Sequence, residues 1–385
     1  MHDKDRSLIP GGIGTVITAI LLSICVILFA YYTYEKSLNH SLTPKSFFEQ
    51  LRAPESEEVK EAQVLYSFDY DFKEKPVFTV YKDYIVKCSS SGIWFLDKTG
   101  EVVWSESISY FNPIVKTNGN YLLVFDTGSL SVCVIKDKAV IWREKLDEEI
   151  INADISKDGS VTIITESKRD NNEVRVFNPG GIEIFRKIIA NEFAVSAGIS
   201  PSSDLLAVSL LTAEASEVHT NFKFYDMKGN DLSSLSFQEP SEILPVFCFN
   251  NDKSLFAFGD SVLAYIDRTE KISWKKQFTR IMGASSSGDK RIAVAVKEPK
   301  GNRLILYDTN GKEVSFCALQ SEPDAICSVK GMIAVNAQDT VYFYNGECKN
   351  IAQYSDNTLI QKVFLLSRHQ AVIITSDNIL VLNID

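Results

Sequence analysis

The stretch "GIWFLDKTGEVVW" (residues 92–104) predicts two short β-strands joined by a tight turn. Apolar side chains fill 93–96 and return at 102–104, and Asp97 to Gly100 separate the two runs. These residues suit a turn, because an Asp side chain accepts hydrogen bonds from nearby backbone and Gly tolerates positive φ. We therefore expect a β-hairpin whose second strand reaches a tryptophan.

The same pattern returns along the rest of the chain. In each copy an apolar run leads into a polar turn and then into a second run that closes on a large apolar side chain. Successive copies end 35 to 50 residues apart, and a period near 40 residues with strands and turns inside each unit is typical of β-propeller blades. One four-stranded blade cannot cover both of its faces, whereas a closed ring of blades can. The later copies end at Trp142, Phe185, Leu235, Trp274, Phe316 and Ile351.

The repeats predict one all-β propeller over residues 64–385. These 322 residues divide into eight blades of about 40 residues or seven of about 46, and propeller repeats run to about 40–45. We predict eight blades, with seven as the alternative. The last repeat, from Leu359 onward, has only three strand-like runs, and "QVLYSFDYD" (Gln63–Asp71) precedes the first blade without a blade of its own. This N-terminal strand is therefore expected to complete the last blade and close the ring.

A membrane anchor is predicted at residues 13–34, after a short tail at 1–12. From Ser7 to Tyr34 there is no charged side chain, and the apolar core Ile13–Tyr32 holds 20 residues. A helix of that length spans a hydrocarbon layer of roughly 30 Å. Tyrosines cluster at its downstream end, as in an interfacial aromatic belt.

Two other readings of this segment are weaker. A cleaved signal peptide has a shorter apolar region and is followed by a small-x-small cleavage site, which we do not find here. A lipoprotein signal ending at Cys25 would have a small residue in place of Ile24. An uncleaved single-pass helix is the prediction.

Residues 35–63 are polar and charged and are predicted to be a linker or stalk. Basic residues stand on both sides of the anchor, so the positive-inside rule does not decide its orientation. The short tail and the large C-terminal head favour a signal-anchor with the propeller outside the cytoplasm.

The six cysteines of the head lie mostly in apolar runs, where an unpaired cysteine acts as a small apolar side chain. Cys317 and Cys327 invite pairing, but the repeat places them on an outer strand and on the next blade's innermost strand, beyond disulfide reach. Unpaired cysteines are unusual outside the cell, and they weigh against the expected orientation.

Composition narrows the classes of function. The chain carries a formal net charge of −10 and lacks a dense Lys/Arg cluster, which disfavours binding to nucleic acid. Four histidines, two of them outside the head, predict neither a histidine-rich metal site nor a His-based catalytic triad. We expect no metal, no cofactor and no enzymatic activity.

Asp97, Thr99, Gly100 and Trp104 together resemble the tryptophan-docking repeat of PQQ-like eight-bladed propellers, a pattern related to WD-repeat propellers. The resemblance implies the fold but not the activity, because the chain has no two adjacent cysteines of the kind found in quinoprotein dehydrogenases. As a whole the chain resembles the membrane-anchored propeller proteins of Gram-positive bacteria. The motif is partial at Trp142 and Trp274, and it is altered at Phe185, Leu235, Glu270 and Phe316.

These observations predict a membrane-anchored, extracytoplasmic propeller that binds a protein or a cell-envelope component. The alternative is a small-ligand sensor or a PQQ-like enzyme that uses the central channel, where polar loop residues from several blades could converge.

Overall fold

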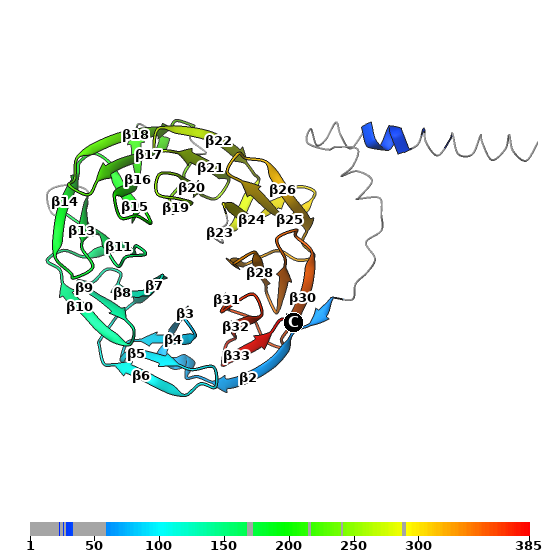
Figure 1. Cartoon of the computed structure of the whole chain (residues 1–385), viewed down its shortest axis with the longest axis horizontal. Helices are drawn as coiled ribbons and strands as arrows, with labels where there is room; N and C mark the ends of the chain where they lie inside the picture. Colours follow the sequence, from blue (N-terminus) through cyan, green and yellow to red (C-terminus); the bar gives the residue numbers. More distant parts are fainter. Residues whose placement is uncertain are drawn as a thin grey trace, which may run out of the picture. The chain divides into compact units, whose positions relative to one another are not determined.

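A computed structural model describes residues 59–167, 172–214, 217–239, 242–286 and 290–385, together with eight residues between 23 and 33. The chain divides into two units, Met1–Glu58 and Val59–Asp385. The second unit is an all-β propeller whose eight blades are arranged around a central axis, and the region along this axis is called the channel (Figure 1). The prediction of eight blades is confirmed, and the seven-bladed alternative is wrong.

The first four blades each use four consecutive antiparallel strands, ordered from the channel to the rim. Blade 1 holds β3 (Val77–Tyr81), β4 (Tyr84–Ser89), β5 (Gly92–Leu96) and β6 (Val102–Glu106). Blade 2 holds β7 (Pro113–Asn118), β8 (Tyr121–Asp126), β9 (Ser131–Lys136) and β10 (Ala139–Lys145). Blade 3 holds β11 (Ile150–Ile155), β12 (Val161–Glu166), β13 (Asn172–Phe177) and β14 (Glu183–Ile189). Blade 4 holds β15 (Phe193–Ile199), β16 (Leu205–Glu214), β17 (Glu217–Asp226) and β18 (Asp231–Phe237).

The next three blades repeat this order, and the last one has three strands from the C-terminal end of the chain. Blade 5 holds β19 (Val246–Phe249), β20 (Leu255–Phe258), β21 (Val262–Asp267) and β22 (Lys271–Gln277). Blade 6 holds β23 (Arg280–Ser286), β24 (Arg291–Glu298), β25 (Gly301–Asp308) and β26 (Glu313–Ala318). Blade 7 holds β27 (Ala325–Val329), β28 (Met332–Ala337), β29 (Thr340–Tyr344) and β30 (Asn350–Ser355). Blade 8 begins with β31 (Lys362–Leu365), β32 (Gln370–Ile374) and β33 (Asn378–Asn383).

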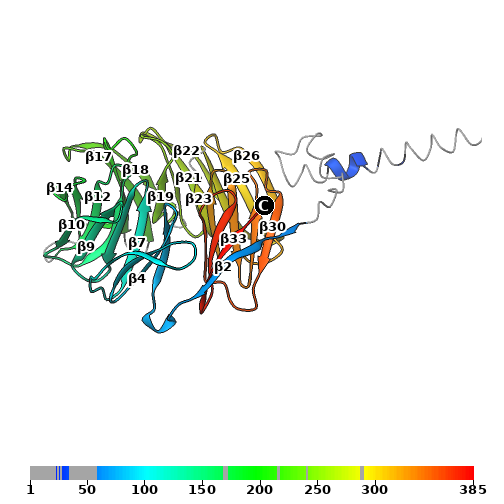
Figure 2. The same ribbon diagram turned by 60° about the horizontal axis from the view of Figure 1, so that its bottom comes forward.

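The N-terminal end of the head joins the last two blades. Strand β2 (Gln63–Asp69) pairs antiparallel with β33 and is the outer strand of blade 8 (Figure 2). Just before it, β1 (Lys60–Glu61) pairs parallel with β30 and adds a fifth strand to blade 7. After β2 a short 3₁₀ turn, η1 (Phe72–Glu74), leads into blade 1. One continuous segment therefore holds blades 7 and 8 together at the closure of the ring.

The structure places the end of the predicted stalk within the propeller, because Lys60 to Gln63 already form strands. The tail at 1–12 and the rest of the stalk at 35–58 lie outside the described residues, and the predicted anchor at 13–34 is described only in part. Within the described part of the chain, no helix is both long enough and apolar enough to cross a membrane.

The hydrophobic core consists of eight separate clusters, each shared by two neighbouring blades. Between blades 1 and 2, for example, Val86 and Phe95 pack with Leu122 and Val124. The middle strands are buried on both faces, so they read as nearly continuous apolar runs. Strand β8, with the sequence YLLVFD, has five buried residues of six.

In four junctions an aromatic ring of one blade lies against a glycine of the next. The ring comes from the outermost strand, and the glycine lies in the turn between the third and fourth strands of the following blade. A Cβ atom on these glycines would stand only 2.6–3.1 Å from the ring, so only glycine permits the approach. The pairs are Phe68–Gly100, Trp142–Gly181, Phe185–Gly229 and Trp274–Gly311.

The turn that carries each glycine is shaped by an Asx side chain. Asp97 Oδ1 accepts hydrogen bonds from the Thr99 backbone N–H (2.8 Å), the Thr99 hydroxyl (2.7 Å) and the Glu101 N–H (3.0 Å). These bonds hold the turn in the form that lets Gly100 adopt φ +91°. The same pair of backbone bonds occurs at Asn178, Asp226, Asp308 and Asn345.

The outer strand of each of the first seven blades contains a β-bulge. We call the residue directly after the bulge the docking position, because in blades 2, 3 and 5 it carries the ring that contacts the glycine of the next blade; this ring–glycine contact is the aromatic dock. In blade 1 the residue after the bulge is Trp104, whose ring centroid lies 4.8 Å from that of Phe95. In blades 4 and 6 it is a serine, Ser233 and Ser315, rather than Leu235 and Phe316. Phe316 lies on the opposite face of β26, where the Arg303 guanidinium stands 4.5 Å from the ring centroid.

Replacing Gly100 by Ala tests the contact between the Phe68 ring and Gly100, which lies at the junction of blades 8 and 1 where the ring closes. The new Cβ would meet the Phe68 ring at 2.6 Å and would also occupy an unfavourable φ. We expect the free energy of unfolding to fall by about 2–4 kcal/mol, measured by denaturant unfolding followed by circular dichroism.

Gly128→Ala is the matched control, because Gly128 also has positive φ (+72°) but no atom within 4 Å of the added Cβ. It should cost only about 1–2 kcal/mol, the backbone part of the effect. Equal losses in the two variants would show that ring contact at Gly100 contributes nothing.

Candidate functional site

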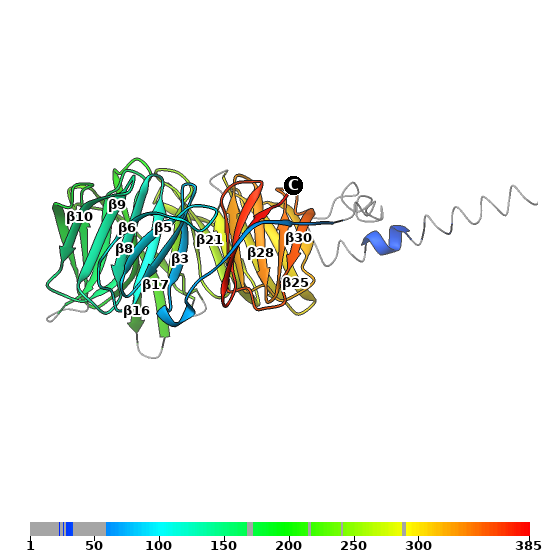
Figure 3. The same cartoon turned by 90° about the horizontal axis from the view of Figure 1, so that it is seen from below.

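The alternation of strand direction sorts the connections between strands onto two faces of the ring. Connections from the fourth strand of one blade to the first of the next share a face with those from the second strand to the third. We call this the acidic face; it is the lower edge in Figure 3, where the hairpin of β16 and β17 projects. The remaining connections form the opposite face.

Negative charge is concentrated on the acidic face. Its described connections contain 14 acidic residues and three basic ones, whereas those of the opposite face contain nine acidic and 12 basic residues. Among the described connections, the surplus of acidic residues therefore lies on one face of the ring. The 14 are Asp71, Glu74, Asp147, Glu148, Glu149, Glu192, Glu239, Glu242, Asp260, Glu322, Asp324, Asp339, Asp356 and Asp377.

Basic side chains from the strands neutralise part of this charge. At least five of the 14 carboxylates form ion pairs, and after these five are subtracted the described connections of this face keep a negative surplus. Glu242 is the most buried of the group: one oxygen pairs with Lys275, and Oε2 has no hydrogen-bond partner among the described residues. The five pairs are Glu74–Lys87, Asp147–Arg175, Glu192–Lys223, Glu242–Lys275 and Glu322–Lys297.

Exposed apolar side chains stand on the same face around the channel mouth. Phe111, which is 93% exposed, lies two residues before β7, and comparable side chains occur at the start of the innermost strand in four other blades. In the opposite mouth, none of the described connections between first and second strands has an exposed large apolar residue. The other four are Ile151, Phe193, Val246 and Leu359.

Two pockets also open at this face. One, of about 350 Å³, lies on the long hairpin of blade 4 and is lined by Thr212, His219, Asn221, Ser236 and Gln238. The other, of about 230 Å³, lies on blade 2, between the connection that leads into it and the ends of β9 and β10. The acidic face therefore combines charge, apolar side chains and concave surface.

Glu192 binds two of the side chains that line the blade 4 pocket. Its carboxylate accepts hydrogen bonds from Asn221 (2.9 Å) and Thr212 (3.2 Å) and pairs with Lys223. Burial by itself would raise the pKa of Glu192, but the bonds from Lys223 and Asn221 outweigh burial and lower it. Glu192 is therefore a fixed anion that orients the polar lining.

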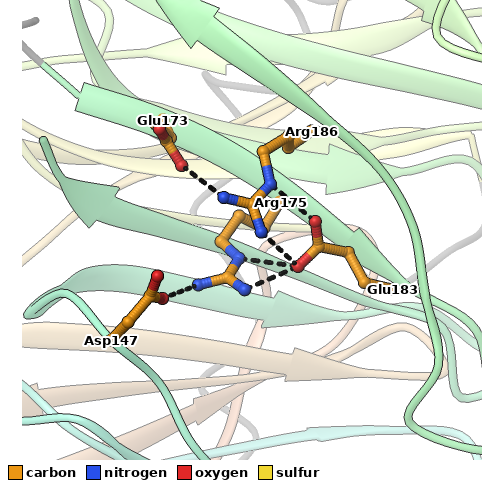
Figure 4. A network of polar contacts seen from close by, with 5 residues as sticks. All are labelled: Asp147, Glu173, Arg175, Glu183 and Arg186. Carbon is orange, nitrogen blue, oxygen red and sulfur yellow. Dashed lines mark hydrogen bonds and ion pairs between the residues drawn. The ribbon is translucent and has the colours of Figure 1, made fainter.

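A network of five charged side chains holds one acidic connection against blade 3 (Figure 4). Arg175 on β13, only 9% exposed, donates to Glu183 through Nε (2.9 Å) and Nη2 (2.6 Å) and to Asp147 through Nη1 (2.6 Å). Arg186 also binds Glu183, at 2.7 Å, and Glu173, at 3.4 Å. Asp147 follows β10 of blade 2, so this network ties blade 2 to blade 3.

The network lowers the pKa of two carboxyl groups. The hydrogen bond from Arg175 lowers the pKa of Asp147. At Glu183 burial acts to raise the pKa, but hydrogen bonds from Arg186 and Arg175 outweigh it, and the result is a lowered pKa. A carboxyl group with a lowered pKa stabilises the fold above its unfolded pKa of about 4, and the contribution is lost as pH falls through the folded value.

The residues predicted from the repeat do not form the acidic face. Asp97 and Gly100 lie in a turn on the opposite face, and the predicted aromatic positions other than Phe316 lie at the blade junctions. Within the described chain, no group of three or more His, Cys, Asp or Glu side chains is arranged to hold a metal ion. The acidic face was not predicted from the sequence. Adding up the charges in every second connection between predicted strands would have revealed it.

Comparison with known proteins identifies the family and the fold. The model of a family described as "Family of unknown function (DUF5711)" matches residues 55–384. No curated protein matches the chain significantly.

Three solved structures are similar in fold. BamB from Moraxella catarrhalis is 14% identical, with a TM-score of 0.55 over 84% of this chain and 99% of that one. Sqt1 from Saccharomyces cerevisiae is 12% identical, with a TM-score of 0.61 over 83% and 98%. The C-terminal WD40 domain of Sif2 is 12% identical, with a TM-score of 0.62 over 85% and 99%. The resemblance to PQQ-like and WD-repeat propellers is confirmed as a likeness of fold.

Replacing Arg175 by Met tests the charged network through its pH dependence. We expect the variant to lose about 2 kcal/mol of stability at pH 7, because charge-assisted hydrogen bonds are removed. Between about pH 5 and pH 3 it should lose less further stability than the wild type, because the lowered pKa values depend on Arg175. Thermal unfolding midpoints across this pH range give the measurement.

The control is Lys187→Met, which removes the ion pair with the largely exposed Asp231. Its pH profile should run parallel to that of the wild type. A parallel profile for Arg175→Met as well would contradict the assignment.

Proposed function

Because the chain belongs to the DUF5711 family, whose function is unknown, we infer its role from the propeller itself. We propose that it is a non-enzymatic binding module for a protein or cell-envelope partner, tethered to a membrane by residues 13–34. The propeller stands outside the cytoplasm in this proposal, as the short N-terminal tail and large C-terminal head favour.

The acidic face is the observation that carries the proposal. Its described connections hold fourteen carboxylates and three basic residues, and this excess of one sign draws an oppositely charged surface and speeds the encounter. Phe111 and the four other apolar side chains at the mouth supply area that a partner can remove from water. The complementary partner presents a basic surface with an apolar centre.

The construction of the ring supports a binding role. Eight clusters buried between blades form a packed frame that holds the connections at the surface. A rigid surface loses little conformational entropy on binding, which favours affinity. The likeness to solved propellers supports the frame alone and says nothing of the partner.

The sequence of the N-terminal segment supports the tether. Its 20-residue apolar core matches the thickness of a bilayer, and the propeller begins only at Lys60, so the polar stalk can separate the two. A module fixed at a membrane meets envelope partners at a raised effective concentration.

Photo-crosslinking in intact membranes tests the binding face. A photoreactive phenylalanine analogue at position 111 should give a reproducible crosslinked partner, identified by mass spectrometry. The same analogue at Ile182, 68% exposed and located on the opposite face, should not. Glu149→Lys combined with Glu239→Lys should reduce the crosslink at 111 at least fivefold, because attraction for a basic partner is weakened.

Three results would count against this assignment. They are equal crosslinking at positions 111 and 182, a crosslink at 111 that the charge reversals leave unchanged, and turnover of a small metabolite bound in the channel.

Protease treatment of intact cells tests tether and orientation. The full-length chain should sediment with membranes and lose its propeller epitope to external protease once the cell wall is removed. A variant that lacks residues 1–58 should be soluble. Protection of the epitope in intact cells, with cleavage only after lysis, would place the propeller inside the cytoplasm.

A further inference from the structure

At the junction between blades 6 and 7, a cysteine stands where four other junctions have a glycine in contact with an aromatic ring. Cys348 takes the place in the turn before β30 that glycine takes in blades 1, 3, 4 and 6, and it has the matching positive φ of +58°. The residue of blade 6 that faces it is Ser315, whose hydroxyl donates to Cys348 Sγ at 3.5 Å. At this position Ser315 therefore faces Cys348, where four other junctions pair an aromatic ring with a glycine.

A second thiol reaches the same point. Cys317 lies two residues after Ser315 on β26, so both side chains point to the same face of the strand. Its partner across the sheet is Leu304, and the Cys348 thiol lies 4.0 Å from the Leu304 carbonyl oxygen. Cys348 belongs to the hydrophobic cluster between blades 6 and 7, and Cys317 packs against the same cluster.

The environment shifts the pKa values of the two thiols in opposite directions. The interaction with the Cys317 thiol lowers the pKa of Cys348, and the hydrogen bond from the Ser315 hydroxyl adds to this effect. The same contact raises the pKa of Cys317. Cys348 is the sulfur that carries negative charge more readily, and the thiolate is the reactive form.

We propose that Cys317 and Cys348 are a redox modification site that forms a disulfide between blades 6 and 7 on exposure to a hydroperoxide. The Cys348 thiolate attacks one peroxide oxygen, the O–O bond breaks, and Cys348 becomes a sulfenic acid as hydroxide leaves. The Cys317 sulfur then attacks the Cys348 sulfur, and the S–S bond forms as water leaves. Overall, two thiols and one hydrogen peroxide give one disulfide and two waters.

Partial exposure of Cys317 distinguishes this pair from Cys88 and Cys133, while Cys348 itself is buried. Cys317 is partly exposed on the outer strand of blade 6, whereas Cys88 and Cys133 are both fully buried between blades 1 and 2. Cys88 and Cys133 therefore provide an internal control: two thiols on facing blades, without a route to solvent. The disulfide would join blade 6 directly to the blade that carries β1.

The test uses the full-length chain in detergent, treated with hydrogen peroxide and then with a thiol-blocking reagent. Digestion without reduction should yield a peptide that links Cys317 to Cys348 in more than half of the molecules, while Cys88 and Cys133 are blocked as free thiols only after denaturation. The oxidised protein should unfold several degrees higher than the reduced protein, and reducing agent should reverse the difference.

Two variants complete the test. Cys317→Ser should abolish both the linked peptide and the thermal shift, and Cys348→Gly, which restores the glycine of the other blades, should do the same while folding normally. The proposal is overturned if Cys317 and Cys348 remain thiols under peroxide, if either links to a different cysteine, or if the thermal shift persists in the variants. Because peptide mapping needs only the wild-type chain, the result does not depend on the variants folding.

Discussion

Burial between neighbouring blades is the interaction on which the structure depends. Every hydrophobic cluster of the head is shared by two sheets, so no blade has a core of its own and each is stable only between two others. The ring must therefore close. Strands β1 and β2 achieve this from the N-terminal side, since they attach to blades 7 and 8 before the chain enters blade 1. The Phe68 ring packs against Gly100 of blade 1 at the junction between blades 8 and 1.

This frame separates stability from recognition. Turns on the opposite face are constrained, because Asx side chains and positive-φ residues shape them for the docks. Connections on the acidic face do not form these aromatic–glycine contacts, and they hold most of the excess carboxylates. The exposed side chains at the mouth and the two pockets lie on the same face. The charged network around Arg175 shows how the two roles meet, since it fixes an acidic connection by joining it to the next blade.

Local chemistry explains which predictions succeeded. The fold class and the number of blades followed from the repeat length and the turn residues, because both can be recognised from residues that are adjacent in the sequence. The dock was less accurately placed: Ser315 stands where Phe316 was expected, since a bulge shifts which side chain faces the next blade, and a shift of one residue reverses the face. Strand β1 has only two residues and no pattern that could announce it.

By itself the sequence determined a ring of repeated four-stranded units, an apolar segment ahead of it and an excess of negative charge. Only the tertiary structure decided where that charge lies, because residues as distant as Asp71 and Asp377 share a face solely through the alternation of strands around a closed circle. The same holds for Cys317 and Cys348, which belong to different blades and meet across a junction. Contacts between units depend on register and closure, which no single repeat encodes.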